Sequence, residues 1–314
     1  MIPKIIHYCW FGGNPLPELA QKCIASWRKY LPDYEIWQWS ERPLHENVNV
    51  IKDNQDNWDN IEPAQRLNFL NQRSDLNSLN GRSALNQRKA RLEHPRKRVM
   101  GFDVEMIPYT AEAYRQKKYA FVSDYARFWI LYKYGGIYFD TDVEVIRPLD
   151  EIIAQGNFMG FELNPDGEND PQKYAPRYAF AVNPGVGLGM EKEHPFIKTM
   201  LDKYAQLEYE TPVFPWGKTI VAYTTEELCK LGLKNVQGIQ DVQGIKVYPH
   251  EYFSPIDVIS GKLHITKNTY TIHRYMGSWG DKRHRSWKDL IRSYIPEWVF
   301  YLNNKIKRRR YKIK

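Results

Sequence analysis

An apolar segment, KYGGIYFDTDVEVI at residues 133–146, carries two carboxylates two positions apart. Its alternation predicts a strand in which Asp140 and Asp142 share one face with Tyr138 and Glu144. Two like charges on one face of a core strand repel each other and resist desolvation unless a cation lies between them. Magnesium and manganese prefer carboxylate oxygens, so a divalent cation is one interpretation. The alternative is a strand that runs out into solvent, with acidic residues at its hydrated end.

The cysteines and the apolar segments bear on the compartment. Cys9, Cys23 and Cys229 are odd in number and lack the spacing of a metal site, which indicates a reducing compartment without a disulfide framework. The first residues, MIPKIIHYCWFGG, contain neither a long apolar region nor a small-residue cleavage site. No window is long enough and sufficiently free of charge to span a membrane. We therefore expect a cytoplasmic protein.

The formal net charge of +8 suggests an anionic partner such as nucleic acid, phosphate or a membrane surface. Most of this imbalance comes from the final segment, NNKIKRRRYKIK, which contains seven basic residues and no acid. The basic character therefore belongs largely to a tail at the C-terminal end.

The pattern of apolar residues predicts an α/β fold. Residues 2–10 and 34–41 read as strands on either side of a helix over 18–30, and this order favours a parallel sheet. A longer helical pattern covers 110–134, with an expected break near Phe121–Ser123 and an expected end at Gly135. Further predicted elements are helices at 194–207 and 224–231 and a last strand at 269–275.

Residues 42–101 do not fit this pattern. They are rich in Asn, Gln and Arg and end in the basic cluster HPRKR. We interpret them as an insertion, partly helical or mobile, that interrupts the α/β pattern and lies outside its main core.

Three segments, taken together, resemble a known family. They are IPKIIHYCWFGG (2–13), SDYARFWILYKYGGIYFDTDVEV (123–145) and TIHRYMGSW (271–279). In this order they are similar to glycosyltransferase family 32, whose sugar-binding region contains a D-x-D motif. The core of that family is similar to the large clostridial glucosylating toxins. The resemblance covers roughly residues 1–41 and 102–280 and leaves the tail over 281–314 outside it.

The resemblance implies a GT-A, Rossmann-like nucleotide-sugar-binding fold with a mixed central sheet flanked by helices. It also implies a nucleotide-sugar donor, a Mn²⁺ or Mg²⁺ ion and retention of the anomeric configuration. In this family Asp142 corresponds to the metal-ligating carboxylate. Asp140 contacts the ribose and the sugar and reaches the metal through water. The bound metal neutralises the diphosphate and stabilises the leaving nucleoside diphosphate.

Further site residues follow from the same resemblance. Ser123, Asp124 and Arg127 contact the donor sugar, although Asp124 and Arg127 at helical spacing could simply form an ion pair. Trp10 stacks on the base, with core burial as the alternative, and Tyr138 packs on the nucleotide unless it is a core tyrosine.

The C-terminal part of the resemblance supplies the remaining candidates. His273 is a metal ligand by resemblance, whereas a lone histidine in a strand is more often structural. Ser278 or Trp279 contacts the diphosphate. Asn183 faces the sugar or the acceptor, beside glycines that permit close approach of the backbone.

Three functions compete at this stage. The first is a retaining, metal-dependent hexosyltransferase that moves a sugar, by front-face displacement, from a nucleotide-sugar to a glycan or lipid-linked glycan in surface or capsular polysaccharide synthesis, with a UDP-sugar favoured as donor. The second is a nucleic-acid-binding protein, which we do not expect because no binding module is recognisable. The third is a metal-dependent phosphoesterase, which would normally show more clustered Asp and His ligands.

The C-terminal segment 281–314 predicts contact with a membrane surface. Its aromatic residues precede the basic run, a combination that suits the headgroup region of an anionic leaflet. We expect a peripheral protein on the inner face of the cell membrane, near a lipid-linked acceptor. The alternative is that the aromatic residues pack on the catalytic domain and only the last residues form a solvated tail.

Overall fold

A computed structural model describes residues 1–41, 97–165, 180–210, 219–257 and 261–276. The chain divides into two units, one formed by residues 1–42 with 97–314 and the other by residues 43–96. All described residues belong to the first unit.

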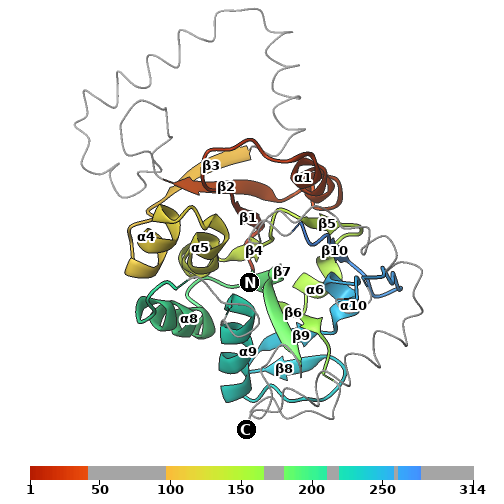
Figure 1. Ribbon diagram of the computed structural model, residues 1–314. Coiled ribbons are helices and arrows are strands. Elements are labelled where there is room, and N and C mark those ends of the chain that lie inside the picture. Colours follow the sequence, from red (N-terminus) through yellow and green to blue (C-terminus); the bar gives the residue numbers. More distant parts are fainter. Residues whose placement is uncertain (42–96, 166–179, 211–218, 258–260, 277–314) are drawn as a thin grey trace, which may run out of the picture. The chain divides into compact units, whose positions relative to one another are not determined.

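The N-terminal half of the central sheet is parallel (Figure 1). β1 (Ile5–Cys9) pairs with β2 (Glu35–Glu41) on one side and with β4 (Gly136–Tyr138) on the other. β2 pairs in turn with the edge strand β3 (Lys97–Phe102). The connection between β1 and β2 is α1 (Glu18–Tyr30), which buries Cys23, Ile24 and Trp27.

The other half mixes strand directions. β4 pairs antiparallel with β7 (Ala181–Met190), which pairs antiparallel with β6 (Asn157–Leu163). β9 (Ile245–Tyr248) runs parallel to β6, and β8 (Gln240–Val242) closes the far edge. The order β3-β2-β1-β4-β7-β6-β9-β8 forms one eight-stranded mixed sheet. A separate pair joins β5 (Val143–Val145) to β10 (Thr271–His273).

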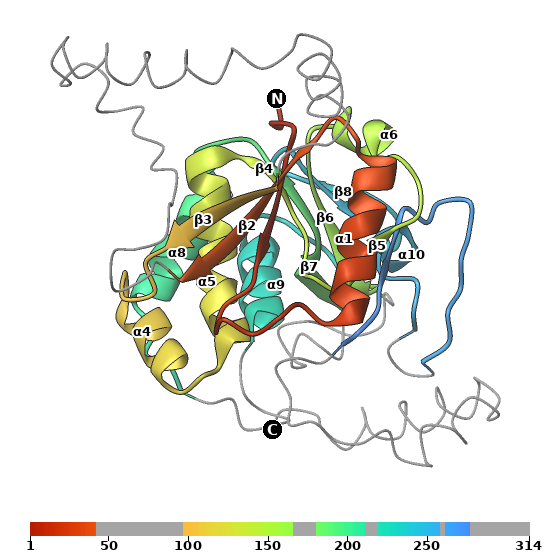
Figure 2. The same ribbon diagram turned by 90° about the horizontal axis from the view of Figure 1, so that it is seen from above.

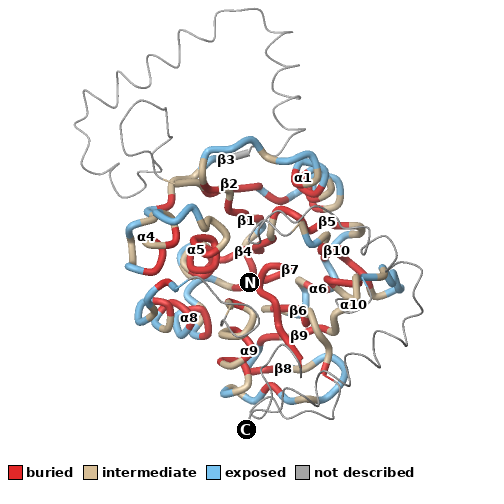
Figure 3. The backbone as a smooth tube through the Cα atoms, in the orientation of Figure 1, coloured by how far each residue is buried: buried red, intermediate tan, exposed pale blue. Residues whose placement is uncertain are grey.

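Helices cover both faces of the sheet (Figure 2). One side carries α4 (Pro108–Arg115), α5 (Tyr119–Tyr134), α8 (Pro195–Ala205) and α9 (Ile220–Lys230). The other side carries α1, α6 (Asp150–Ile153) and α10 (His250–Phe253). Two apolar clusters fill these two spaces, and the inner strands β1, β4, β6 and β7 between them are mostly buried (Figure 3). The predicted α/β class, with a mixed central sheet flanked by helices, is confirmed.

The predicted break in the helical segment is at the wrong place. Residues Phe121–Ser123 lie inside α5, because Phe121 and Val122 face the core. The interruption falls between α4 and α5, where Lys117 adopts a left-handed backbone with φ of +57°. Gly135 ends α5 as predicted, with φ of +63°. α8 and α9 correspond to the other predicted helices, α9 beginning at Ile220.

The prediction of one continuous strand through the D-x-D motif is also wrong. β4 ends at Tyr138 and β5 begins at Val143, so Asp140, Thr141 and Asp142 form a turn between two short strands. The Val143 N–H donates to the Asp140 carbonyl over 3.0 Å and closes this turn. The apolar alternation continues on both sides because each short strand is buried in its own sheet.

The sheet also includes residues 97–101, which the composition placed with the insertion. Their basic side chains suit an edge strand, because Arg98 lies over the Trp37 ring and approaches Glu35. The remainder of the insertion, 42–96, lies outside the described residues.

We find no helix in the described ranges that combines the length and the apolar character needed to cross a bilayer.

Candidate functional site

The turn that carries the two aspartates is fixed by strands on both sides. The Asp140 N–H donates to the Gly185 carbonyl of β7 over 2.9 Å, and the Phe139 N–H donates to the His7 carbonyl of β1. Since β1 and β4 are parallel neighbours, Trp10 and the turn leave the sheet at the same edge. Ligands bind at this carboxyl edge in open α/β sheets.

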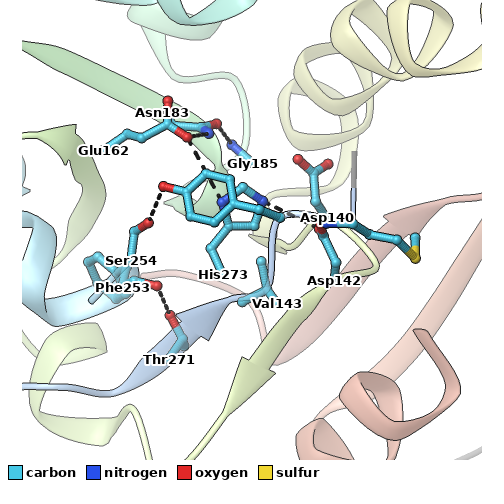
Figure 4. Close-up of polar contacts among 12 residues, drawn as sticks. Asp140, Asp142, Val143, Glu162, Asn183, Gly185, Phe253, Ser254, Thr271 and His273 are labelled. Atoms are coloured by element: carbon cyan, nitrogen blue, oxygen red, sulfur yellow. Dashed lines mark hydrogen bonds and ion pairs between the residues drawn. The ribbon is translucent and has the colours of Figure 1, made fainter. Parts of the chain in front are cut away.

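Asp142 and His273 face each other across the two-stranded sheet. β5 and β10 align Val143 with His273, which places His273 Nε2 3.4 Å from Asp142 Oδ1 (Figure 4). The Met276 N–H donates to Asp142 Oδ2 over 2.7 Å. Burial opposes ionisation of Asp142, but the hydrogen bonds from His273 and Met276 outweigh it and hold the pKa of Asp142 below its usual value. Burial likewise opposes the charged form of His273, but Asp142 outweighs it and raises the pKa of His273.

Three side chains at this edge have the chemistry of a cation site. Asp140, Asp142 and His273 each offer one ligand atom, and these atoms lie within 4.8 Å of one another. Two carboxylates and an imidazole suit a divalent cation such as manganese or magnesium. Asp142 and His273 are buried and Asp140 is partly open to solvent. The residues present therefore fit the metal that the resemblance implies.

A buried ion network joins α5 to the turn. Arg127 Nη2 lies 3.1 Å from Asp124 Oδ1 and 3.3 Å from Asp140 Oδ1. Arg127 Nε also donates to the Ser123 carbonyl over 3.1 Å. The guanidinium lies over the Tyr138 ring at 4.7 Å, and the Tyr138 hydroxyl donates to Asp140 Oδ1 over 3.2 Å. Asp124 and Arg127 thus form the ion pair that their spacing allowed, and this pair lies in the same site as Asp140.

Burial acts on the pKa values of the charged groups in this network. Burial raises the pKa of the Asp124 carboxyl to about 7, and Arg127 partly offsets that rise. Burial opposes the charge on Arg127, but Asp140, Tyr138 and Asp124 outweigh it and keep the guanidinium protonated, with its pKa raised. Arg127 Nη1 has no hydrogen-bond partner among the described residues although it is fully buried. A free donor of this kind can bind a hydroxyl of a ligand.

The backbone of β7 packs closely against this network at Gly185. A Cβ at Gly185 would lie 1.9 Å from Asp140 Oδ2 and 2.9 Å from Arg127 Nη1, so only glycine fits there. The Gly185 N–H donates to Asn183 Oδ1 over 2.7 Å, and Asn183 Nδ2 donates to Glu162 Oε1 over 3.1 Å. Figure 4 shows Asn183 and Glu162 on the side of His273 opposite to Asp142.

Sequence reasoning missed two members of this site, Glu162 and Tyr275. Glu162 Oε1 lies 3.9 Å from His273 Nδ1, and the Tyr275 ring lies 4.2 Å from the His273 ring. The signal for Glu162 was a carboxylate at the end of the apolar run NFMGFEL, the same kind of signal that marked Asp140.

The remaining candidates are less constrained. Trp10 is half-buried, and its ring nitrogen donates to the Asn14 carbonyl over 2.6 Å, so its stacking on a base stays a prediction. Ser278 and Trp279 lie outside the described residues, as does the whole tail over 281–314.

Comparison with known proteins identifies part of the chain. Residues 17–159 match the family model of the glycosyltransferase sugar-binding region containing a DXD motif. This match includes α1, α5 and the turn with Asp140 and Asp142. The family resemblance inferred from the sequence is confirmed.

Two curated relatives are mannosyltransferases by name. Inositol phosphoceramide mannosyltransferase 1 of Schizosaccharomyces pombe is 22% identical over 183 residues, which are 57% of this chain and 40% of the relative. Initiation-specific alpha-1,6-mannosyltransferase of Candida albicans is 27% identical over 113 residues, which are 32% of this chain and 29% of the relative. The chain thus spans less than half the length of these relatives.

Solved structures give weaker likenesses. The PaToxG glycosyltransferase has a TM-score of 0.36 at 18% identity and covers 64% of this chain and 59% of its own. The UDP-bound glycosyltransferase domain of the YGT toxin has a TM-score of 0.32 at 12% identity, with 64% and 61% covered.

Proposed function

We propose that this chain, whose residues 17–159 carry the DXD-containing sugar-binding region of a glycosyltransferase family, transfers a sugar from a nucleotide-sugar donor to a glycan acceptor in a metal-dependent reaction. One observation supports this most directly. The DXD turn lies at the carboxyl edge of the parallel strands, and His273, which is more than 130 residues away in sequence, meets it there.

Three residues would hold the cation. Asp142 and His273 come from the paired strands β5 and β10, and Asp140 comes from the turn. The bound ion would neutralise the donor diphosphate and lower the energy of the leaving nucleoside diphosphate.

The network on α5 would hold the donor sugar. Arg127 is fixed by Asp124 and Asp140 and has a free buried donor at Nη1. Such a preorganised donor orients a hydroxyl without reorganisation during the reaction. Trp10, at the same edge of the sheet, would stack on the base. Asn183 stands on the other side of the site, toward the sugar or the acceptor.

We further propose retention of configuration. Asp124, Asp140 and Asp142 are engaged by Arg127, His273 and the Met276 N–H, and Glu162 accepts from Asn183, which argues against a free carboxylate nucleophile of the kind that retaining hydrolases use. The acceptor hydroxyl would attack from the face that the diphosphate leaves, and a phosphate oxygen would take its proton.

For the donor and the acceptor we propose a chemical class and not a single compound. A UDP-sugar is the first candidate, and the names of the two relatives bring nucleotide-mannose donors into the same test. The acceptor would be a glycan or a lipid-linked glycan of surface polysaccharide synthesis. We propose a cytoplasmic location with the basic tail on an anionic leaflet. Cosedimentation with anionic but not neutral vesicles, lost when residues 305–314 are removed, would support this.

Thermal shift separates the competing functions. We expect UDP or GDP with Mn²⁺ to raise the melting temperature well beyond the nucleotide alone or Mn²⁺ alone. A panel of nucleotide-sugars, scored by donor hydrolysis, then identifies the sugar. Stabilisation by oligonucleotides only would instead support nucleic-acid binding. Hydrolysis of phosphomonoesters without any use of nucleotide-sugars would support the phosphoesterase.

The pairing of β2 with β3 determines how long a link that replaces residues 43–96 must be. β2 and β3 are parallel with Ile36 opposite Lys97 and Glu41 opposite Phe102, so the link must return along the length of β2. Parallel strands need a connection of about a dozen residues or more. We predict that a Gly/Ser link of about 15 residues in place of 43–96 keeps donor hydrolysis within about threefold, since such loops cost little stability.

A second deletion is the control for this prediction. Replacing 42–101 by the same link removes most of β3, exposes the edge of β2 and should lower the melting temperature strongly. Loss of donor hydrolysis in a folded 43–96 replacement would instead show that this segment contributes to the donor site.

A further inference from the structure

The two nitrogens of His273 have different surroundings. Nε2 lies 3.4 Å from Asp142 Oδ1, on the side where Asp140 and Asp142 gather. Nδ1 is fully buried and has no hydrogen-bond partner within the described part of the chain. The carboxylate that faces it is Glu162, with Oε1 at 3.9 Å, beyond hydrogen-bond range by less than about 1 Å. A buried polar nitrogen without a partner requires an explanation.

Glu162 is itself held in place. Its Oε1 accepts from Asn183 Nδ2 over 3.1 Å. The Tyr275 hydroxyl, whose pKa is raised by burial and by the nearby Glu162 carboxylate, lies 2.9 Å from Ser254 Oγ. Tyr275 covers the His273 ring from a left-handed backbone with φ of +48°, a conformation that costs energy in a residue with a side chain. Polar groups from β7 and from the segment after β10 thus lie around Glu162 of β6, beside the Nδ1 edge of His273.

The chemistry of imidazole connects this arrangement to the cation. A neutral histidine carries its proton on one nitrogen and its lone pair on the other. If Nε2 is to bind a metal beside Asp140 and Asp142, the proton must sit on Nδ1. A buried N–H at Nδ1 then needs an acceptor, and the nearby carboxylate is Glu162. Outer carboxylates of this kind fix the tautomer and orientation of metal-binding histidines.

We propose that Glu162 is the positioning residue of His273: its carboxylate accepts the Nδ1 proton and leaves Nε2 free for the divalent cation. The inference rests on the metal dependence in the proposed function. Asn183 holds Glu162 in this place, beside Tyr275, so Asn183 acts on the metal site through Glu162 besides facing the sugar or acceptor.

Metal affinity tests this proposal without using turnover. Mn²⁺ is titrated into the full chain with saturating UDP, and free Mn²⁺ is followed by electron paramagnetic resonance. We expect Glu162→Ala to weaken Mn²⁺ binding about 10- to 100-fold. Glu162→Gln keeps an acceptor oxygen but loses the charge, so it should fall between wild type and Glu162→Ala. Equal losses in both variants would mean that Glu162 acts only through its charge and would overturn the proposal.

A matched control removes a nearby charge of the same type. Glu144 lies in β5, two residues after Asp142, and its carboxylate is engaged by Arg274 over 2.8 Å and does not face His273. Glu144→Gln should change Mn²⁺ affinity by no more than about twofold. A loss of Mn²⁺ affinity as large as that of Glu162→Gln would mean that long-range charge alone explains both losses, and it would overturn the proposal.

The tautomer gives a second measurement, made on the wild-type chain. Long-range ¹H–¹⁵N spectra with Mg²⁺ and UDP should show the His273 proton on Nδ1, with the resonance assigned by its loss in His273→Asn. A proton on Nε2 in that state would refute the proposal. Wild-type protein that binds no Mn²⁺ with UDP would overturn the metal dependence itself. Tight binding that is unchanged in Glu162→Ala would overturn only the role of Glu162.

Discussion

The Asp142→Asn variant is expected to lose sugar transfer by roughly a thousandfold or more, because stabilisation of the leaving group by a bound cation is worth several kcal/mol. Asp142 is 8% exposed, its pKa is held low by His273 and the Met276 N–H, and it therefore offers a full negative charge in a buried place. An amide is neutral and a poorer ligand. Metal-dependent binding of UDP should fall together with transfer.

The fold should survive this substitution. An asparagine oxygen can still accept from the Met276 N–H, which reaches Asp142 Oδ2 over 2.7 Å. Thermal unfolding without metal should therefore change little, whereas the increase in melting temperature from UDP with Mn²⁺ should disappear. Asp142→Ala is the contrasting variant, because it leaves that N–H and His273 without their acceptor and should also destabilise the protein. Near-normal transfer by folded Asp142→Asn at saturating Mn²⁺ would remove Asp142 from the site.

The local parts of the fold could be predicted from the sequence. α1 begins and ends where the periodicity of Leu19, Cys23, Ile24 and Trp27 predicted, because a helix is specified by contacts within a few residues. The end of α5 at Gly135 was equally local, since glycine adopts the left-handed backbone there without strain.

The turn at the D-x-D motif could not be predicted in this way. β4 is held by β1 and β7, and β5 is held by β10, so two different sheets impose the same apolar alternation on adjacent residues. A period of two cannot show that the chain passes from one sheet to the other. The turn depends on pairing with residues about 130 positions away, which spacing along the chain does not record.

The site residues divide in the same way, into those that are close in sequence and those that strand pairing brings together. Asp140, Asp142, Asp124 and Arg127 lie close in sequence: the spacing of the two aspartates suggested a cation, and the family resemblance added Asp124 and Arg127 to the same site. Gly185 and Glu162 reach the site through the antiparallel pair β6–β7, which places Phe161 opposite Val182 and Gly160 opposite Asn183. The carboxylate at the end of NFMGFEL was a signal for Glu162, but the groups that Glu162 and Gly185 approach are revealed only by the assembled sheet.

Arg127→Ala is expected to reduce donor turnover by about 10²- to 10³-fold, the usual effect of removing a preorganised donor to a reacting group. The binding of UDP with Mn²⁺ should fall by no more than about tenfold, because Arg127 is assigned to the sugar and influences the metal only through Asp140, 3.3 Å away. Arg127→Lys keeps the charge but cannot reach Asp124 and Asp140 together, so it should be intermediate. Equal losses of UDP binding and turnover would instead indicate a structural or phosphate role.

The loss of stability in Arg127→Ala should also depend on pH, and the ionisation of Asp124 decides whether the loss is larger at high or at low pH. Burial has raised the folded pKa of Asp124 to about 7, above that of the unfolded chain, so its stabilising contribution is present below the unfolded value and is lost as pH rises through the folded value. Arg127 is the partner that lowers this pKa, and without it the folded pKa rises further. The variant should therefore lose more stability relative to wild type at pH 8, where wild-type Asp124 is ionised beside Arg127, than at pH 5, where Asp124 is protonated in both proteins. Urea unfolding of both proteins at the two pH values measures this difference, and a deficit that is equal at both, or larger at pH 5, would show that the buried pair does not act as an ion pair.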